Sequence, residues 1–127
     1  MTAPHATQPT RDGKLRAYSD GGTGPLALML HRLADATVLY TAYARPSDPN
    51  YYDDNAFKQT LDSLIVALEP TVVLDLHSSH AYRPYDIDFG TMHGRSLLDR
   101  NDILPLLHQK LSDEGLRNFS SIYFRED

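Results

Sequence analysis

The chain of 127 residues carries a formal net charge of −5, and its basic side chains are scattered rather than gathered in a stripe, which argues against a nucleic-acid partner. It has no cysteine, which excludes disulfides and thiolate ligands and leaves imidazole and carboxylate as the metal-binding side chains. No apolar run approaches the ~20 residues that cross a bilayer and no signal peptide is recognisable, so we expect a single domain over residues 1–127, cytoplasmic and without a membrane partner.

The first half of the chain predicts a helix and a strand before a loop. The first ~20 residues are polar and irregular, and they end in a glycine-rich turn over residues 19–24. Pro25, with Thr23 as a nearby cap, is typical of a helix start. Apolar residues then recur at helical spacing at Leu26, Met29, Leu30 and Leu33. Residues 37–43 are short and β-rich, which predicts a strand, and residues 45–54 predict a loop.

The second half continues the alternation of helices and strands. Apolar spacing predicts a helix from Phe57 to Leu68, ended by Pro70. Residues 71–76 form a short apolar run that predicts a strand buried on both faces, as in a parallel sheet. We further expect a short strand over 85–89, a helix around 104–111 closed by Gly115, and a last strand over 119–124. The pattern predicts an α/β domain.

The segment after residues 71–76 concentrates the side chains that carry chemistry. Ligands of open α/β sheets bind beyond the carboxyl ends of the strands, and His77 follows the most convincing buried strand. A metal tolerates only small errors in ligand position, so a rigid strand end suits a ligand. Asp75 is two residues before His77, on the same face of an extended chain, and could orient the imidazole by a hydrogen bond.

Residues 75–97, DLHSSHAYRPYDIDFGTMHGRSL, resemble the central motif of the N-formylglutamate amidohydrolase family. That motif is a buried strand, then Asp-Leu-His, an Arg-x-x-Asp segment and a Gly-Thr pair. Three upstream segments are similar to further family loops in the same order: residues 3–6 (APHA), 19–24 (SDGGTG) and 48–51 (DPNY). The resemblance implies a three-layer α/β/α fold with a mostly parallel central sheet, as in zinc carboxypeptidases, of which this chain would be an incomplete version.

The resemblance also implies one zinc ion with ligands of the type His-Glu-His. Carried over by position, these ligands are His5, Asp20 and His77; Asp20 departs from the expected glutamate, and its side chain is one methylene shorter. Zinc accepts either carboxylate. Two imidazoles and a carboxylate leave a fourth position for a water, whose pKa the metal lowers toward ~7. The implied activity is hydrolysis of the amide bond of a small N-formyl or N-acyl amino acid.

Further residues receive roles in this hypothesis. Arg83 suits a substrate carboxylate because its guanidinium is a planar fork, and Asn50 and His80 are further candidates for substrate binding. The reaction needs a general base, which the family supplies as a glutamate after a late strand. Glu126 follows an apolar run and is the candidate here, although it comes sooner than in the family. The alternative is a non-catalytic domain that binds a metal, a small acidic ligand or a partner.

Overall fold

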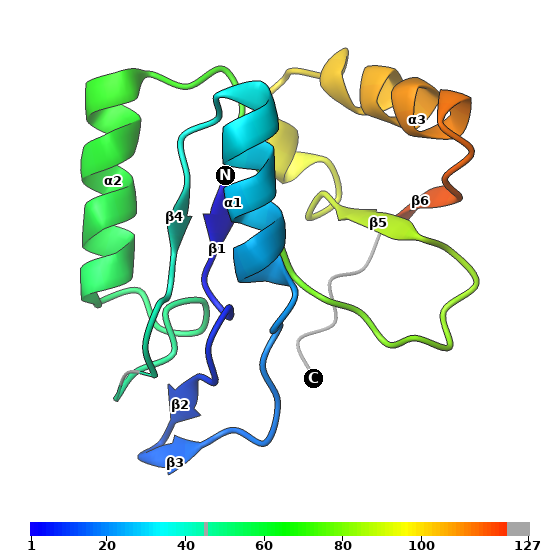
Figure 1. Cartoon of the computed structure of the whole chain (residues 1–127). Coiled ribbons are helices and arrows are strands. Elements are labelled where there is room, and N and C mark those ends of the chain that lie inside the picture. The colour runs from blue at the N-terminus through cyan, green and yellow to red at the C-terminus, as the bar shows by residue number, and fades with distance from the viewer. Residues whose placement is uncertain (45, 122–127) are drawn as a thin grey trace. The chain divides into compact units, whose positions relative to one another are not determined.

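The computed structural model describes residues 1–44 and 46–121. The chain forms two compact units, residues 1–79 and 80–127, which are described separately below (Figure 1). The described part is mixed α/β, with three α-helices and short strands in two-stranded sheets, two of them parallel. The α/β class expected from the sequence is therefore confirmed. Within the described ranges, no helix is long and apolar enough to cross a membrane.

The first unit is organised around β1 (Thr2–Ala3), which the sequence did not predict. β1 pairs in parallel with β4 (Leu39–Tyr40), beside which it lies in Figure 1. On its other side, Thr2 forms a parallel bridge with Asp75 through 2.8 Å bonds to the backbone of residues 74 and 76. The expectation of an irregular N-terminus is wrong here. Two residues ahead of a proline carry no alternation pattern, and only the long-range pairing makes them a strand.

Both strands predicted beside β1 are shorter in the structure. The strand expected over residues 37–43 is reduced to β4. The one expected over 71–76 is an extended segment with a single bridge at Asp75, and its burial on both faces is wrong, because Val72 and Val73 are exposed. A continuous apolar run indicates only that a segment can be buried. Whether it is buried depends on what packs against it.

A hairpin follows β1 and was also missed. β2 (Thr10–Arg11) pairs antiparallel with β3 (Lys14–Leu15). The two residues between them, Asp12 and Gly13, have φ values of 51° and 70°. An Asp-Gly pair with positive φ at both positions is the preferred two-residue hairpin turn. This signal was present in the sequence, and the hairpin could have been predicted from it.

Helix α1 (Thr23–Ala34) confirms the helix predicted at Pro25, but not its cap or its face. Gly22 is the N-cap residue, while the Thr23 hydroxyl donates to the Asp20 carbonyl at 2.7 Å. The buried helix residues are Thr23, Gly24 and Ala27, whereas Leu26, Met29 and Leu33 are exposed. Small residues therefore form the contact face of α1, which brings its N-terminus close to the loop after β1.

Helix α2 (Ala56–Leu68) begins and ends where the sequence predicts. The Asn55 side chain caps it by accepting from the Lys58 amide at 2.9 Å, which satisfies one of the donors that a helix start leaves unpaired. Glu69, just before Pro70, adopts the left-handed conformation at the C-cap. Phe57, Leu61 and Leu64 are half-buried along one side, as their spacing predicts, whereas Ile65 and Leu68 of the same apolar pattern are exposed.

The second unit contains β5 (Ile87–Gly90), η1 (Arg95–Leu97), α3 (Ile103–Asp113) and β6 (Asn118–Ser121). β5 and β6 pair in parallel, which confirms the short strand expected near residues 85–89. The helix expected around 104–111 is α3, and Gly115 follows it with φ 77°. His108 of α3 hydrogen bonds to Asn118 and to Ser120 of β6. The predicted continuation of the last strand, residues 122–124, lies outside the described residues.

Candidate metal centre

Polar side chains form a large part of the buried interior of the first unit. The buried apolar side chains among the described residues are small: Ala3, Ala27 and the prolines Pro4, Pro9 and Pro49. The buried polar ones are Thr2, His5, Asp20, Thr23, Thr41 and Asp48. Burial of a polar group is unfavourable unless hydrogen bonds replace those to water, and no described buried side-chain donor or acceptor lacks a partner. The ionisable side chains among these buried residues, His5, Asp20 and Asp48, are the candidates for a functional site.

Two of these residues, His5 and Asp20, are held together by their backbones. The Asp20 amide donates to the His5 carbonyl at 2.8 Å, and the Thr23 amide donates to the Asp20 carbonyl at 2.8 Å. Asp20 therefore connects the start of α1 to the loop after β1. On the other side of that loop, the Thr41 hydroxyl donates to the Pro4 carbonyl at 3.0 Å. The backbone around His5 is therefore held by hydrogen bonds on both sides, independently of the contacts of its ring.

His77 reaches the same place from the neighbouring extended segment. Parallel pairing at Thr2 and Asp75 puts the carboxyl ends of β1 and of this segment at one edge. His5 and His77 each follow such an end by two residues. Their rings lie edge to face, with centroids 5.2 Å apart and planes at 74°. Parallel pairing is the arrangement from which a ligand site at His77 was expected, because ligands bind beyond the carboxyl ends of parallel strands.

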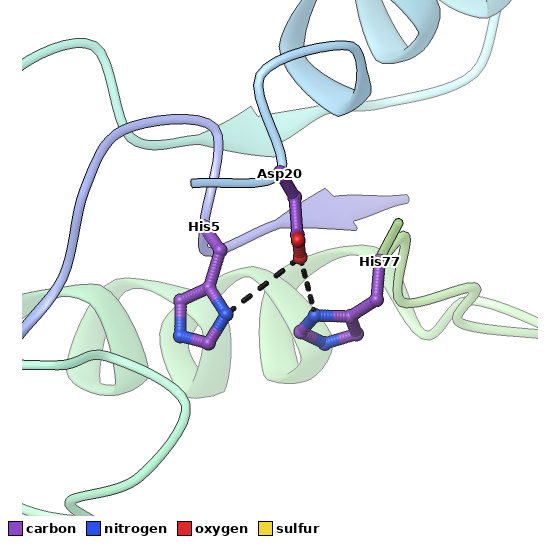
Figure 2. Close-up of side chains that lie close together, drawn as sticks. All are labelled: His5, Asp20 and His77. Carbon is purple, nitrogen blue, oxygen red and sulfur yellow. Dashed lines mark hydrogen bonds and ion pairs between the residues drawn. The ribbon is translucent and has the colours of Figure 1, made fainter. Parts of the chain in front are cut away.

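The three side chains converge on one oxygen atom (Figure 2). Asp20 Oδ2 lies 2.9 Å from His77 Nδ1 and 3.7 Å from His5 Nδ1. One ligand atom from each of the three residues lies within 4.8 Å of the other two. His5 and Asp20 are buried and His77 is half-buried. The structure thus brings together all three residues that the sequence predicted as metal ligands.

Two of the three separations between ligand atoms in this group are close to what zinc requires. Tetrahedral zinc with ligands at about 2.0–2.2 Å places neighbouring ligand atoms about 3.4 Å apart. The 2.9 and 3.7 Å separations of Asp20 Oδ2 from the two imidazole nitrogens lie on either side of that value. Shifts of about half an ångström would bring both to it. Two imidazoles and one carboxylate are also a donor set that suits zinc, so the residues fit the ion.

A second carboxylate, Asp48, orients His5 and was not assigned a role from the sequence. Asp48 is fully buried, and its Oδ1 accepts from His5 Nε2 at 2.7 Å. The same oxygen accepts from the Asn50 and Tyr51 amides at 2.9 and 3.1 Å. A proton on Nε2 leaves Nδ1, the nitrogen that faces Asp20, available to a metal. Asp48 therefore selects the tautomer of His5 that can act as a ligand.

Asp75 orients His77, and Ser78 orients Asp20, in the way that Asp48 orients His5. Asp75 Oδ2 lies 3.1 Å from His77 Nε2, so the predicted pairing of these residues on one face is present. Asp75 is itself held by the Thr2 hydroxyl, which donates to Oδ1. The Ser78 hydroxyl donates to Asp20 Oδ1 at 2.7 Å and leaves Oδ2 facing the imidazoles. Each group that could bind a metal has its remote atom occupied by a hydrogen bond.

These contacts shift the ionisation of the cluster. Burial disfavours the imidazolium of His77, but the hydrogen bonds to Asp20 and Asp75 outweigh burial and raise its pKa to about 9. Burial would raise the pKa of Asp20, yet its contacts with both imidazoles and with Ser78 hold this pKa well below the usual range. The pKa of Asp48 is lowered to about 2, because the bonds from His5, Arg11 and Asn50 exceed the cost of burial.

The metal-free protein should therefore be most stable in mildly acidic solution. A folded pKa of about 9 for His77 gives stability that is complete below its unfolded value of 6.5 and is lost as the pH rises through 9. The lowered pKa of Asp48 gives stability present above 3.8 and lost as the pH falls through about 2. Thermal unfolding with a chelator, measured from about pH 2 to pH 9, follows the loss of stability at low pH and at high pH. The pKa of His5 is also raised above 6.5, so His77→Gln should reduce the decline between pH 6.5 and 9 without abolishing it, and a wild-type stability that is flat there would contradict the assignment.

Gly24 provides a test of how α1 positions His5. A Cβ atom at Gly24 would lie 3.1 Å from the Cβ of Ala6, the residue after His5, whereas one at Gly22 would meet nothing within 4 Å. We expect Gly24→Ala to displace the loop that carries His5, because Ala6 must move by a few tenths of an ångström, whereas Gly22→Ala should leave this loop in place. Gly24→Ala should therefore bind zinc more weakly. Zinc titration of the two variants measures this difference, and equal behaviour would contradict close packing at Gly24.

The other predicted site residues are distributed over both units. Asn50 lines a small cavity of about 120 Å³ in the first unit, together with Asp75. His80 and Arg83 belong to the second unit, where the His80 ring stacks on Tyr82 and the Arg83 guanidinium lies 5.8 Å from the centroid of that ring. Glu126, the candidate general base, lies outside the described residues.

Comparison of the chain with protein-family models, with curated proteins and with solved structures found no match.

Proposed function

We propose that the first unit binds one zinc ion through His5, Asp20 and His77, and that the protein hydrolyses the amide bond of a small N-formyl or N-acyl amino acid. The observation that carries the proposal is the convergence of the three side chains, with ligand atoms within 4.8 Å of one another and Asp20 Oδ2 at 2.9 and 3.7 Å from the two imidazole nitrogens. Segments far apart in the sequence supply them, and each is oriented by a further hydrogen bond. The resemblance of residues 75–97 to the N-formylglutamate amidohydrolase motif supplies the reaction class. A zinc-carboxypeptidase-like arrangement of the sheet and a cytoplasmic location belong to the same proposal.

The roles of the side chains follow from their contacts. A bound zinc ion would supply Lewis acidity and lower the pKa of a coordinated water. Asp48 keeps a proton on Nε2 of His5, and Asp75 does so on Nε2 of His77, so that both imidazoles present Nδ1. Ser78 restrains Asp20 to one free oxygen. Asn50 lines the cavity next to Asp75 and is available to bind the substrate. Arg83, His80 and the general-base role of Glu126 remain predictions from the sequence.

Hydrolysis assays separate this function from the non-catalytic alternative. Purified protein is freed of metal with a chelator, then assayed with N-formyl- and N-acetyl-amino acids before and after addition of one equivalent of zinc. We expect release of the free amine only after zinc is restored, and none from Asp20→Asn. Zinc binding without hydrolysis of any of these substrates would favour a domain that binds a metal and a ligand. Failure to bind zinc would remove the hydrolase and leave, of the alternative, a domain that binds another metal, a small acidic ligand or a partner.

A further inference from the structure

Arg11 lies beside the metal centre and takes no part in it. Its Nε donates to Asp48 Oδ2 at 2.6 Å, while His5 Nε2 contacts Asp48 Oδ1. The arginine and the histidine thus share the two oxygens of one buried carboxylate. Arg11 comes from the β2–β3 hairpin, which is separate from the segments that supply the three candidate ligands. No role was assigned to it from the sequence.

Two further contacts fix the orientation of this guanidinium. The carbon Cζ of Arg11 lies 4.3 Å from the centroid of the Tyr51 ring, which packs against its flat face. The backbone amide of Tyr51 donates a hydrogen bond to Asp48 Oδ1 at 3.1 Å. The Arg11 side chain is 15% exposed, so it is largely buried while solvent still reaches part of it. An arginine that is fixed through Nε and one face has little conformational freedom left, so a ligand that binds it pays a small entropic cost.

The hydrogen-bonding capacity of Arg11 exceeds what the described residues use. A guanidinium has five N–H donors. Among the hydrogen bonds of residues 1–44 and 46–121, Asp48 engages Nε, and the Nη groups have no acceptor. The two Nη groups form the part of the guanidinium that binds a carboxylate in a two-point contact. A second carboxylate of the chain does not fill this position in the described part.

We propose that Arg11 is the substrate-binding residue that recognises the free carboxylate of an N-acyl amino acid, at the centre formed by His5, Asp20 and His77. This inference rests on the proposed hydrolase function and adds the residue that gives it specificity for anionic substrates. Asp48 then serves both halves of the site, since one of its oxygens orients a candidate ligand and the other orients the carboxylate-binding arginine. Arg83, the arginine expected in this role, is not required for it.

A matched pair of ligands tests the inference. N-acetyl-L-alanine and N-acetyl-L-alaninamide differ only in the carboxylate. Their binding to the zinc-loaded protein is measured by NMR titration, with kcat/KM measured in parallel. We expect the wild type to prefer the acid by about 10–100-fold, as for a charge-assisted two-point contact. Arg11→Gln, which keeps an N–H donor for Asp48, should remove this preference. Arg32→Gln, the same charge change at an exposed position of α1, should retain it.

The outcomes separate this inference from the function beneath it. Equal binding of acid and amide by the wild type, or an undiminished preference in Arg11→Gln, would overturn the role of Arg11. The role of Arg11 would also be overturned if Arg83→Gln lost the preference for the acid while Arg11→Gln kept it. Arg11→Lys, which keeps the charge beside Asp48, guards against misfolding and should retain a reduced preference. If zinc is not bound at all, the proposed function fails, and the same ligand pair can still be titrated against the metal-free protein.

Discussion

Replacing His77 with alanine is expected to weaken zinc binding by about 100-fold or more. A structural zinc site with four ligands has an apparent binding free energy of about 10–16 kcal/mol, or about 3 kcal/mol for each ligand. His77 Nδ1 is one of two imidazole nitrogens that face Asp20 Oδ2, so its loss would leave two of the three proposed ligands. Competition with a chromophoric chelator at pH 7.5 measures the dissociation constants of the wild type and the variant.

A second histidine provides the control for this measurement. His80 is three residues further along, is exposed, and stacks on Tyr82 in the second unit. His80→Ala should retain the zinc affinity of the wild type within about twofold, because a surface histidine contributes no ligand. Equal affinities for the wild type and His77→Ala would remove His77 from the site. A loss in His80→Ala as large as in His77→Ala would mean that zinc binds elsewhere.

Replacing Asp48 with asparagine is expected to lower both stability and zinc affinity. The fully buried carboxylate accepts hydrogen bonds from the His5 ring, the Arg11 guanidinium and two backbone amides. An asparagine carries one oxygen and one NH₂ group, so one of these donors would face another donor. We expect a loss of about 3 kcal/mol in the free energy of unfolding, typical of breaking a buried charged pair. Zinc affinity should fall about 10–100-fold, because His5 loses its fixed tautomer.

Asp53 supplies the matched control for this substitution. Its carboxylate is fully exposed and pairs with Lys58 at 3.0 Å, and exposed ion pairs contribute little. Asp53→Asn should therefore change neither stability nor zinc affinity measurably. Urea unfolding of both variants without metal, followed by zinc titration, distinguishes the two effects of Asp48. If Asp48→Asn were as stable as Asp53→Asn and bound zinc as tightly as the wild type, Asp48 would not orient His5.

The sequence predicts the helices of this protein better than its strands. α1, α2 and α3 follow from apolar spacing and from helix-ending residues such as Pro70 and Gly115, because these signals are local. β1 could not be predicted, since its two residues become a strand only by pairing with segments about 40 and 70 residues away. The burial of residues 71–76 was wrong for the same reason: it depends on neighbours that a single segment does not reveal.

Some residues of the candidate site could be predicted from the sequence and others could not. His5, Asp20 and His77 were predicted through a resemblance that preserves their order, and the structure brings them together. Asp48 and Arg11 were missed. Asp48 belongs to a recognised loop, but its burial against His5 and Arg11 joins three separate segments. No local pattern distinguishes such an aspartate from one that only forms a turn.

X-ray absorption spectroscopy at the zinc edge tests the central claim most directly. The protein is loaded with one equivalent of zinc at pH 7.5, and the spectrum is compared with that of Asp20→Asn. His5, Asp20 and His77 predict a first shell of nitrogen and oxygen at about 2.0–2.1 Å, with the outer-shell scattering of two imidazoles. Asp20→Asn should bind less zinc with the same two imidazoles. A wild-type spectrum with one imidazole or none, or with a shell of six oxygens, would contradict a metal centre built from these three side chains.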